Sequence, residues 1–232
     1  MLDRKIYAVI VAAGSGSRFG ATIPKQFCTL CGRPVVMTAI ERMYNSIPNV
    51  ELRLVLSGSF IEQWQEMCKE YKFDSPQVVV GGSSRWESVK NAISSIPVAD
   101  DVDAVVMVHD AARPLITQEV AMRLIAALES GYDGAVPCVP LVDSIRVLYS
   151  NGSSEAVDRA MYRAVQTPQA FMLNKLRQAY ELPYSPLMTD DASVMEAFGL
   201  KNIALVEGDN SLMKITRPGD MEYIEYFLKS EQ

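Results

Sequence analysis

Short, continuously apolar runs recur along the first 140 residues, and a loop or an amphipathic segment follows each. The runs are IYAVIVAA, ELRLVLS, QVVVGG, DAVVMVHD and GAVPCVP. Runs that do not alternate apolar with polar residues are typical of parallel strands buried on both faces. Helical spacing occupies the stretches between them, Pro34–Ile47, Phe60–Tyr71, Ser83–Ile96 and Thr117–Ser130. This rhythm predicts a doubly wound α/β sheet.

Three loops of this sheet each follow one of the apolar runs. They start at Ala13, Gly81 and Asp110. In doubly wound sheets, ligands bind beyond the carboxyl ends of the strands. We therefore expect the three loops to meet at one crevice.

The rhythm breaks between about Pro140 and Gln166, where two strand-like pieces are joined by a turn cluster at Ser150–Ser154. A hairpin with apolar positions on both arms has little core of its own, so we expect it to cover a partner subunit. Helices follow near Leu173–Tyr180 and Asp190–Phe198, then a strand at Asn202–Val206 and a last helix after Pro218. Residues 1–232 are predicted to form a single domain, with the hairpin as an arm.

Composition restricts the class of protein. The chain has 22 basic and 28 acidic residues and a net charge of −6, which argues against nucleic acid or a membrane surface as a partner. An anionic ligand would need a local basic pocket. Four cysteines in 232 residues are too few for a disulfide framework and favour the cytoplasm. The apolar run after Arg4 and Lys5 is too short for a typical signal peptide, and nothing approaches the roughly 18 apolar residues of a membrane span.

The segment VAAGSGSRFGATIPKQF raises the question of phosphate binding. Gly14 and Gly16 permit a tight turn whose backbone N–H groups can approach phosphate oxygens. Phe19 stands where a dinucleotide fingerprint needs its third glycine, and the Gly-Lys-Ser/Thr of a P-loop is absent. Arg18 and Lys25 remain, two cations that could neutralise a triphosphate or could be ordinary surface residues.

The other loops carry fewer clues, and each has a structural alternative. In GGSSRWESV, the glycines either allow a base to approach or only make a turn, with Ser83 or Ser84 capping the helix. In VHDAARP, Asp110 could hold Mg²⁺ or cap a helix, and His109, the only histidine, is interpreted as structural. In MTDDAS, Thr189 or Asp190 is expected to cap a helix.

Five segments in this order identify a family: AAGSGSR…PKQ, GGSSRWESV, VHDAARP, TPQAF…TDDAS and VEG…KITRPGD. From about residue 6 to residue 228 the chain resembles the 2-C-methyl-D-erythritol 4-phosphate cytidylyltransferase family of the non-mevalonate isoprenoid pathway. The resemblance implies a Rossmann-like, mostly parallel sheet and transfer of CMP from CTP to a sugar-alcohol phosphate, with Mg²⁺. It also implies a homodimer in which the β-hairpin arm reaches the partner's site.

The resemblance further implies roles for individual residues. Arg18 and Lys25 match cations that stabilise the α-phosphate in the transition state, and Asp110 matches the residue associated with Mg²⁺. Arg159 and Lys214 match the pair that positions the second substrate. The nucleotide positions are Ala12, Ala13, Gly14, Gly16, Gly82, Arg85 and Ser88, and the sugar-phosphate pocket corresponds to Arg113, Ser144, Thr167 and Thr189.

The chain departs from the family pattern at two positions. Leu212 replaces a frequent amide, and Ser144 stands where threonine is common. The CxxC of Cys28 and Cys31 falls at variable positions of the pattern, which argues against a zinc-binding or redox function. The nearest rival is ribitol 5-phosphate cytidylyltransferase. A Rossmann dehydrogenase is disfavoured by Phe19, and a non-catalytic nucleotide-binding protein would bind CTP without releasing pyrophosphate.

Overall fold

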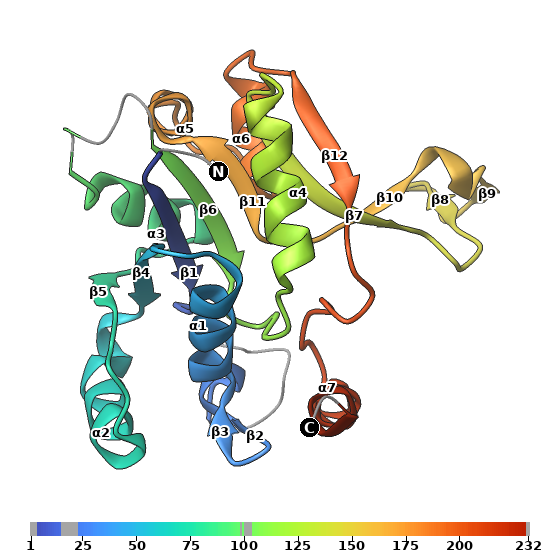
Figure 1. Cartoon of the computed structure of the whole chain (residues 1–232). Helices are drawn as coiled ribbons and strands as arrows, with labels where there is room; N and C mark the ends of the chain where they lie inside the picture. Colours follow the sequence, from blue (N-terminus) through green and yellow to red (C-terminus); the bar gives the residue numbers. More distant parts are fainter. Residues whose placement is uncertain (1–3, 15–22, 98, 100–103, 231–232) are drawn as a thin grey trace.

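A mixed sheet of eight strands runs through the middle of the computed structural model, which describes residues 4–14, 23–97, 99 and 104–230. The strand order is β10-β7-β11-β6-β1-β4-β5, and β12 pairs with β7 (Figure 1). The strands are β1 (Ile6–Val11), β4 (Glu51–Leu56), β5 (Gln77–Val80), β6 (Val105–Asp110), β7 (Gly134–Pro140), β10 (Arg163–Val165), β11 (Gln169–Met172) and β12 (Ile203–Glu207). The pairs β1–β4, β1–β6, β4–β5 and β7–β12 are parallel, which confirms the predicted mostly parallel α/β sheet.

Helices cover both faces of this sheet (Figure 1). One face is covered by α1 (Val35–Ser46), α2 (Ile61–Tyr71) and α4 (Gln118–Glu129), and the other by α3 (Arg85–Ser94), α5 (Leu173–Ala179) and α6 (Asp191–Ala197). Successive side chains of a strand point to opposite faces. Accordingly, Ala8 and Ile10 of β1 lie in the first core and Tyr7 and Val9 in the second, all fully buried. The continuous apolar runs therefore reflect burial on both faces.

One antiparallel strand was absent from the sequence-based prediction. Strand β11 inserts between β6 and β7, whereas β10, which pairs with the end of β7, falls within the second strand-like piece predicted before Gln166. The run that forms β11 is only four residues long, and α5 starts at the next residue. A run this short, with no turn residues after it, cannot be distinguished from the start of a helix by periodicity.

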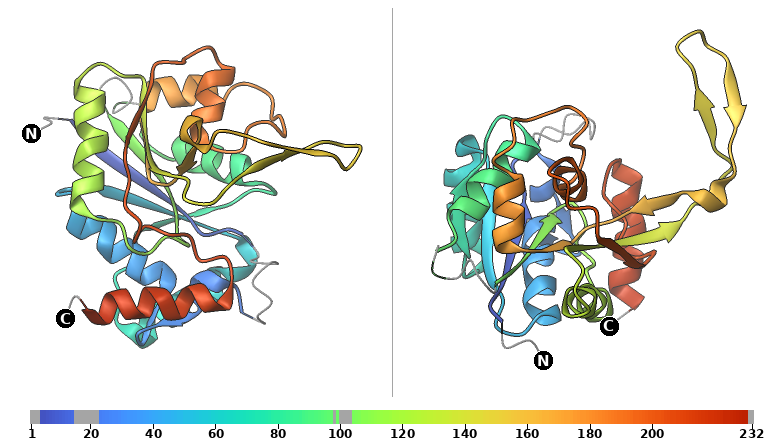
Figure 2. Two further views of the ribbon diagram at one scale, coloured as in Figure 1. Left: turned by 90° about the vertical axis from the view of Figure 1, so that its right-hand side faces the viewer. Right: turned by 90° about the horizontal axis from the view of Figure 1, so that it is seen from above.

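The C-terminal helix α7 (Pro218–Ser230) packs against a small hairpin rather than on the central sheet (Figure 2). The hairpin consists of β2 (Thr29–Leu30) and β3 (Arg33–Pro34), which sequence analysis did not predict. Its turn contains Cys31 and Gly32, both with positive φ, so the second cysteine of the CxxC occupies a tight turn. Leu30, Ile215 and Ile224 share the small core beneath α7.

An arm formed by residues 140–166 projects from the body of the molecule (Figure 2). Strands β8 (Arg146–Leu148) and β9 (Ser154–Ala156) pair antiparallel within it, as the turn cluster between them predicted. At the base, β10 pairs with β7. Val142 and Met161 are each 80% exposed, so the arm presents apolar side chains that the described part of the chain leaves uncovered.

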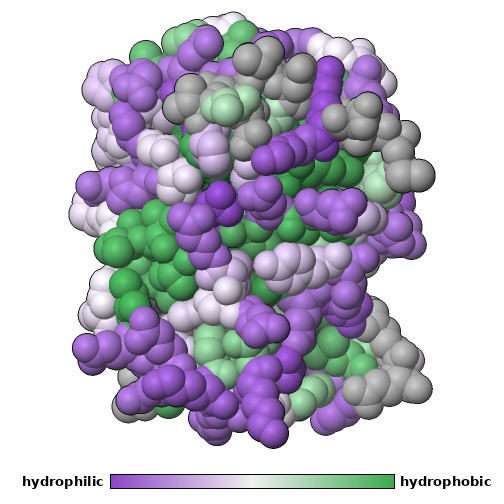
Figure 3. Space-filling view, turned by 60° about the vertical axis from the view of Figure 1, so that its left-hand side comes forward, coloured by the Kyte–Doolittle hydropathy of each residue, from purple (hydrophilic) through white to green (hydrophobic). Residues whose placement is uncertain are grey.

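The side of the molecule that carries α2, α3 and β5 is mostly hydrophilic, with a band of apolar side chains across its middle (Figure 3). Strand β5 is the edge strand of the sheet, and Val80 at its end is more than half exposed. None of the helices among the described residues combines the length and the apolar character needed to cross a bilayer.

Candidate active site

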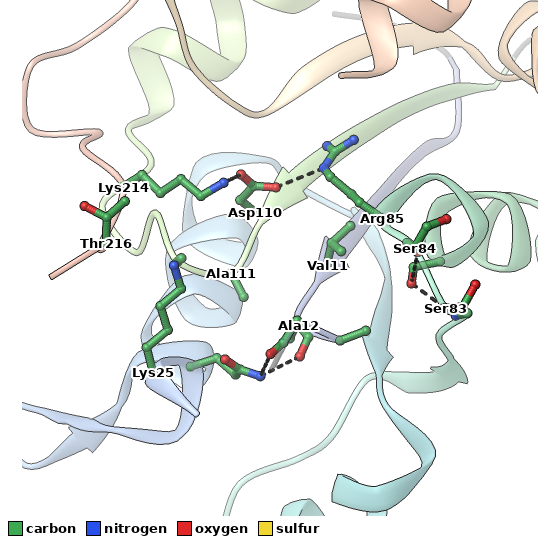
Figure 4. A pocket seen from close by; sticks show the side chains of 16 residues that line it. Val11, Ala12, Lys25, Ser83, Ser84, Arg85, Asp110, Ala111, Lys214 and Thr216 are labelled. Atoms are coloured by element: carbon green, nitrogen blue, oxygen red, sulfur yellow. Dashed lines mark hydrogen bonds and ion pairs between the residues drawn. The ribbon is translucent and has the colours of Figure 1, made fainter. Parts of the chain in front are cut away.

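A cavity of about 610 Å³ opens at the carboxyl ends of β1, β5 and β6. The predicted convergence of the loops that follow these three strands is therefore confirmed (Figure 4). The residues that line the cavity are Val11, Ala12, Ala13, Gly14, Lys25, Gln26, Gly82, Ser83, Ser84, Arg85, Ser88, Asp110, Ala111, Ala112, Lys214 and Thr216. Among the predicted site residues, Gly16 and Arg18 lie outside the described part of the chain.

Close packing of two loops forms one wall of the cavity. A Cβ atom at Gly81 would come within 2.6 Å of the Ala13 Cβ, so only glycine allows the loops after β1 and β5 to pack this closely. The Gly82 N–H donates to the Ser88 hydroxyl at 3.1 Å, and Ser84 caps α3 by accepting from the Glu87 N–H. The structure thus brings the predicted nucleotide positions Ala12, Ala13, Gly14, Gly82 and Ser88 to one wall.

Lys25 enters the cavity from a different element, the short 3-10 helix η1 (Lys25–Phe27). Its Nζ donates to the Ile215 carbonyl oxygen at 2.6 Å. Lys214 belongs to that same C-terminal segment and points toward Asp110 (Figure 4). Two lysines that are 189 positions apart therefore share one cavity.

Asp110 lies between two cations. Its Oδ2 is 2.6 Å from Lys214 Nζ, and its Oδ1 is 3.3 Å from Arg85 Nε. Burial of the carboxyl opposes ionisation, but the charges of Arg85 and Lys214 outweigh it and hold the pKa of Asp110 well below its usual range. Asp110 is therefore a carboxylate at neutral pH.

Arg85 bridges Asp110 and a second, fully buried carboxylate, Asp191. Its guanidinium donates to both oxygens of Asp191, at 2.7 and 3.2 Å, and the Tyr180 hydroxyl donates to Asp191 Oδ1 at 2.6 Å. Burial lowers the pKa of Arg85, but the charges of Asp191 and Asp110 raise it overall, so this cation stays charged. Sequence analysis placed Arg85 at the nucleotide and missed Asp191 and Tyr180.

The only available signal for Asp191 was the acidic pair in MTDDAS. The first aspartate, Asp190, caps α6, because its Oδ1 accepts from the Ser193 N–H at 2.9 Å. This agrees with the predicted cap. The second aspartate points into the interior and binds Arg85, a role that its neighbours in the sequence do not reveal.

His109 and Thr167 form a hydrogen-bonded chain behind Asp110. The Asp110 N–H donates to the Thr167 hydroxyl at 3.0 Å, and that hydroxyl donates to His109 Nδ1 at 3.2 Å. On the other side of the ring, Nε2–H donates to the Arg113 carbonyl oxygen at 2.8 Å. Burial lowers the pKa of His109 to about 4, so the ring is neutral and its two nitrogens are satisfied, as a structural histidine requires.

Four of the six predicted substrate-positioning residues are spread over three places. Lys214 lines the main cavity, whereas Thr189 lines a neighbouring hollow of about 280 Å³ that also contains Trp86 and Tyr180. Ser144 and Arg159 lie on the exposed arm, where the Arg159 guanidinium donates to the Val142 carbonyl oxygen.

Arg113 acts as a brace at the edge of the site. Its guanidinium donates to the carbonyl oxygens of Leu212 at 2.8 Å and Val165 at 3.4 Å, and it is not among the residues that line the cavity. Leu212, which sequence analysis expected in place of a frequent amide, is fully buried in the apolar core. At this position the side chain contributes to packing.

The donor set can be compared with what a metal ion needs. Within the described residues, no three His, Cys, Asp or Glu side chains are grouped as ligands. Mg²⁺ is commonly held by one or two carboxylates together with substrate phosphate oxygens and water. Asp110, ionised and at the cavity wall, fits the protein's part of such a site.

Comparisons with known proteins place the chain among nucleotidyltransferases. A family profile described as 2-C-methyl-D-erythritol 4-phosphate cytidylyltransferase matches residues 6–230. Proteins of that name from Porphyromonas gingivalis and Bacteroides fragilis are each 40% identical, covering 99% and 93% of this chain and 100% and 95% of their own. The crystal structure of the Francisella tularensis protein of that name has a TM-score of 0.77 at 27% identity, covering 96% of this chain and 99% of that one.

Proposed function

This chain belongs to the 2-C-methyl-D-erythritol 4-phosphate cytidylyltransferase family, and we propose how its residues carry out the reaction of that family. It is a cytidylyltransferase of isoprenoid biosynthesis that transfers CMP from CTP to 2-C-methyl-D-erythritol 4-phosphate and releases pyrophosphate. The observation that carries the residue-level proposal is the meeting of Lys25, Lys214 and Asp110 at one cavity.

The reaction is a direct displacement at the α-phosphorus of CTP. An oxygen of the acceptor's phosphate forms the new bond, and the bond from the α-phosphorus to the oxygen that bridges the β-phosphorus breaks, so that pyrophosphate leaves. A phosphate monoester has a second pKa of roughly 6 and is mostly a dianion at neutral pH. The nucleophile therefore needs no general base, which agrees with a chain whose one histidine is buried and neutral.

The main barrier is the approach of one anion to another. Lys25, and with it Arg18, would stabilise the charge that develops on the α-phosphate. The wall formed by Ala12, Ala13 and Gly14 together with Gly82 and Ser88 would bind the nucleotide. Fixed cations and N–H groups act without reorganising during the reaction, which is why they suit this task.

Asp110 would hold Mg²⁺ together with phosphate oxygens of CTP. When bound, the metal ion supplies positive charge at the triphosphate. Both Asp110 oxygens already have cationic partners, Arg85 and Lys214. Lys214 would therefore interact with both Asp110 and the acceptor's phosphate, and it would orient that phosphate for attack.

The arm would complete the acceptor pocket across a homodimer. Arg159 and Ser144 would reach the partner's cavity. Thr167 behind Asp110, Thr189 in the neighbouring hollow and Arg113 at the edge of the site would complete the acceptor pocket. Apolar side chains on the arm, including Val142 and Met161, support an interface, because such surfaces are usually covered. We propose a single nucleotidyltransferase domain that acts as a cytoplasmic homodimer, with neither nucleic acid nor membrane as a partner.

A pyrophosphate-release assay with CTP, Mg²⁺ and two separate acceptors tests the proposed function. We expect rapid release with 2-C-methyl-D-erythritol 4-phosphate and little with ribitol 5-phosphate. Preference for ribitol 5-phosphate would assign the second acceptor instead. Binding of CTP without release with either acceptor would indicate a non-catalytic nucleotide-binding protein.

A further inference from the structure

Two buried glutamines beside the cavity have no role in the chemistry described above. Gln26 is 3% exposed and Gln166 is 5% exposed, although glutamine side chains are mostly found at protein surfaces. Each side-chain amide binds backbone groups of another loop, which is 12 to 14 positions away for Gln26 and 43 positions away for Gln166. The loop bound by Gln26 contains Ala12 and Gly14 of the predicted nucleotide-binding wall, and the loop bound by Gln166 precedes Lys214 in the sequence.

Gln26 joins η1 to the start of the glycine-rich loop. Its Nε2 donates to the carbonyl oxygens of Ala12 at 2.8 Å and Gly14 at 2.9 Å. Because both partners are acceptors, only the NH₂ end of the amide can face them. Gln26 is the residue after Lys25, so these bonds also set the distance between that lysine and the nucleotide wall.

Gln166 holds the segment that precedes Lys214. Its Nε2 donates to the Asp209 carbonyl oxygen at 2.7 Å, and its Oε1 accepts from the Asp209 N–H at 3.1 Å. The Gln166 side chain packs closely against this segment, because a Cβ atom added at Gly208 would come within 2.2 Å of Gln166 Oε1. The segment is braced again three residues later, where Arg113 donates to the Leu212 carbonyl oxygen.

We propose that Gln26 and Gln166 are positioning residues for opposite sides of the reaction. Gln26 holds the backbone that binds CTP in register with Lys25, and Gln166 holds the segment that presents Lys214 to the acceptor. Each acts through hydrogen bonds to a loop backbone, without contacting the reacting atoms. The inference rests on the proposed roles of the two loops.

Glutamate substitutions test this proposal, because glutamate has nearly the size of glutamine but lacks the N–H donors. Steady-state KM values for CTP and for 2-C-methyl-D-erythritol 4-phosphate are measured for Gln26→Glu and Gln166→Glu, with melting temperatures. Gln65→Glu, at an exposed position on α2, is the matched control and should behave as the unmodified enzyme does. Gln26→Met and Gln166→Met remove the hydrogen bonds without adding charge.

A split between the two substrates is expected. Gln26→Glu should raise the KM for CTP about tenfold or more and leave the KM for the acceptor within about twofold, since two buried carbonyl oxygens lose their donors. Gln166→Glu should raise the KM for the acceptor about tenfold or more and leave the KM for CTP within about twofold. The methionine variants should show the same split with smaller changes. A general loss of stability would not separate the two substrates in this way.

Two results would overturn the proposal. One is a pair of folded variants whose KM values for both substrates match the unmodified enzyme or rise together. The other is unfolding of both the glutamate and the methionine variants, because the glutamines would then hold the fold and not the loops. If the unmodified enzyme releases no pyrophosphate, the proposed function fails by itself, and calorimetric CTP affinities of the Gln26 variants still test the role of that residue.

Discussion

The cavity and the arm show two ways in which one chain places charged groups. At the cavity, Lys25, Asp110 and Lys214 are held by ion pairs and by hydrogen bonds to loop backbones within the same chain. On the arm, Arg159 lies among exposed residues, and the nearby Met161 is 80% exposed. The cavity is therefore preorganised by the fold, whereas the arm has no core that would hold Arg159 in one place.

This difference indicates what each region needs in order to work. Groups that stabilise a transition state are effective when they are fixed before the reaction starts, and the cavity meets that condition by itself. A hairpin without a core gains a defined position only when another surface covers it. The contrast predicts that cavity variants impair the chemical step, while arm variants impair acceptor binding and depend on a partner subunit.

The largest effect is expected for Lys25→Ala. Loss of a preorganised cation at the α-phosphate should lower turnover on the order of 100- to 1000-fold, because the developing charge loses its partner. CTP should still bind, since the backbone wall is unchanged. Pyrophosphate release measures the first quantity and calorimetry the second, with Lys69→Ala at an exposed position on α2 as control. Near-normal turnover would show that Lys25 is not part of the catalytic charge.

A smaller, substrate-specific effect is expected for Arg159→Ala on the arm. The KM for the acceptor should rise about tenfold to 100-fold through loss of charged hydrogen bonds, with little change in the KM for CTP. Arg146→Ala is the matched control, because that guanidinium is bound to Ser154 within the hairpin.

Mixing the Lys25→Ala and Arg159→Ala chains, with the acceptor kept well below the KM of the Arg159→Ala enzyme, tests whether the arm acts in the partner's site. In a mixed dimer, the subunit that retains Lys25 would receive the intact arm of the Lys25→Ala subunit. Random exchange should then restore about a quarter of full activity, because half of the dimers are mixed and each has one complete site. If activity does not return although the subunits exchange, the arm serves its own chain.

The smallest effect on turnover near neutral pH is expected for His109, which is buried and neutral behind Asp110. Its pKa falls from 6.5 to about 4 on folding because of burial, so the unfolded chain binds the proton first as the pH drops. The free energy of unfolding should therefore decrease between about pH 6.5 and 4, by on the order of 3 kcal/mol. Urea unfolding across this range measures the change.

The variant His109→Gln isolates this histidine. It should show a flatter pH dependence over the same range, and a slope as steep as that of the unmodified protein would assign the effect to other groups. Asp110, whose pKa is lowered, loses its stabilising charge only at more acidic pH, so the two contributions are separable. The arm contains no histidine, so its structure should not respond to this titration.

Much of the fold could be predicted because its signals are local. The apolar runs, the helical spacing and the turn cluster of the arm each correspond to an observed element. The short strand β11 was missed because a four-residue run has too few positions to show a period. Its insertion between β6 and β7 is settled by which edge of the sheet is free to pair, which depends on the whole fold.

The part of the site that was predicted also depends on local sequence signals. Ligands of doubly wound sheets bind beyond the carboxyl ends of the strands, so the shared location of Gly14, Gly82 and Asp110 could be predicted without knowing which strands pair. The network of Arg85, Asp191 and Tyr180 did not, because these residues come from three different elements and their contacts leave no periodic pattern.

By itself, the sequence determined the order of most strands and helices, the family, and the presence of cations around a glycine-rich loop. Tertiary structure alone decided which polar groups are bound to one another: Asp110 between Arg85 and Lys214, and Gln26 against Ala12 and Gly14. The reason is physical. Hydrophobic periodicity is a property of neighbouring residues, whereas hydrogen bonds and ion pairs depend on distances of a few ångströms between segments that only the packed fold brings together.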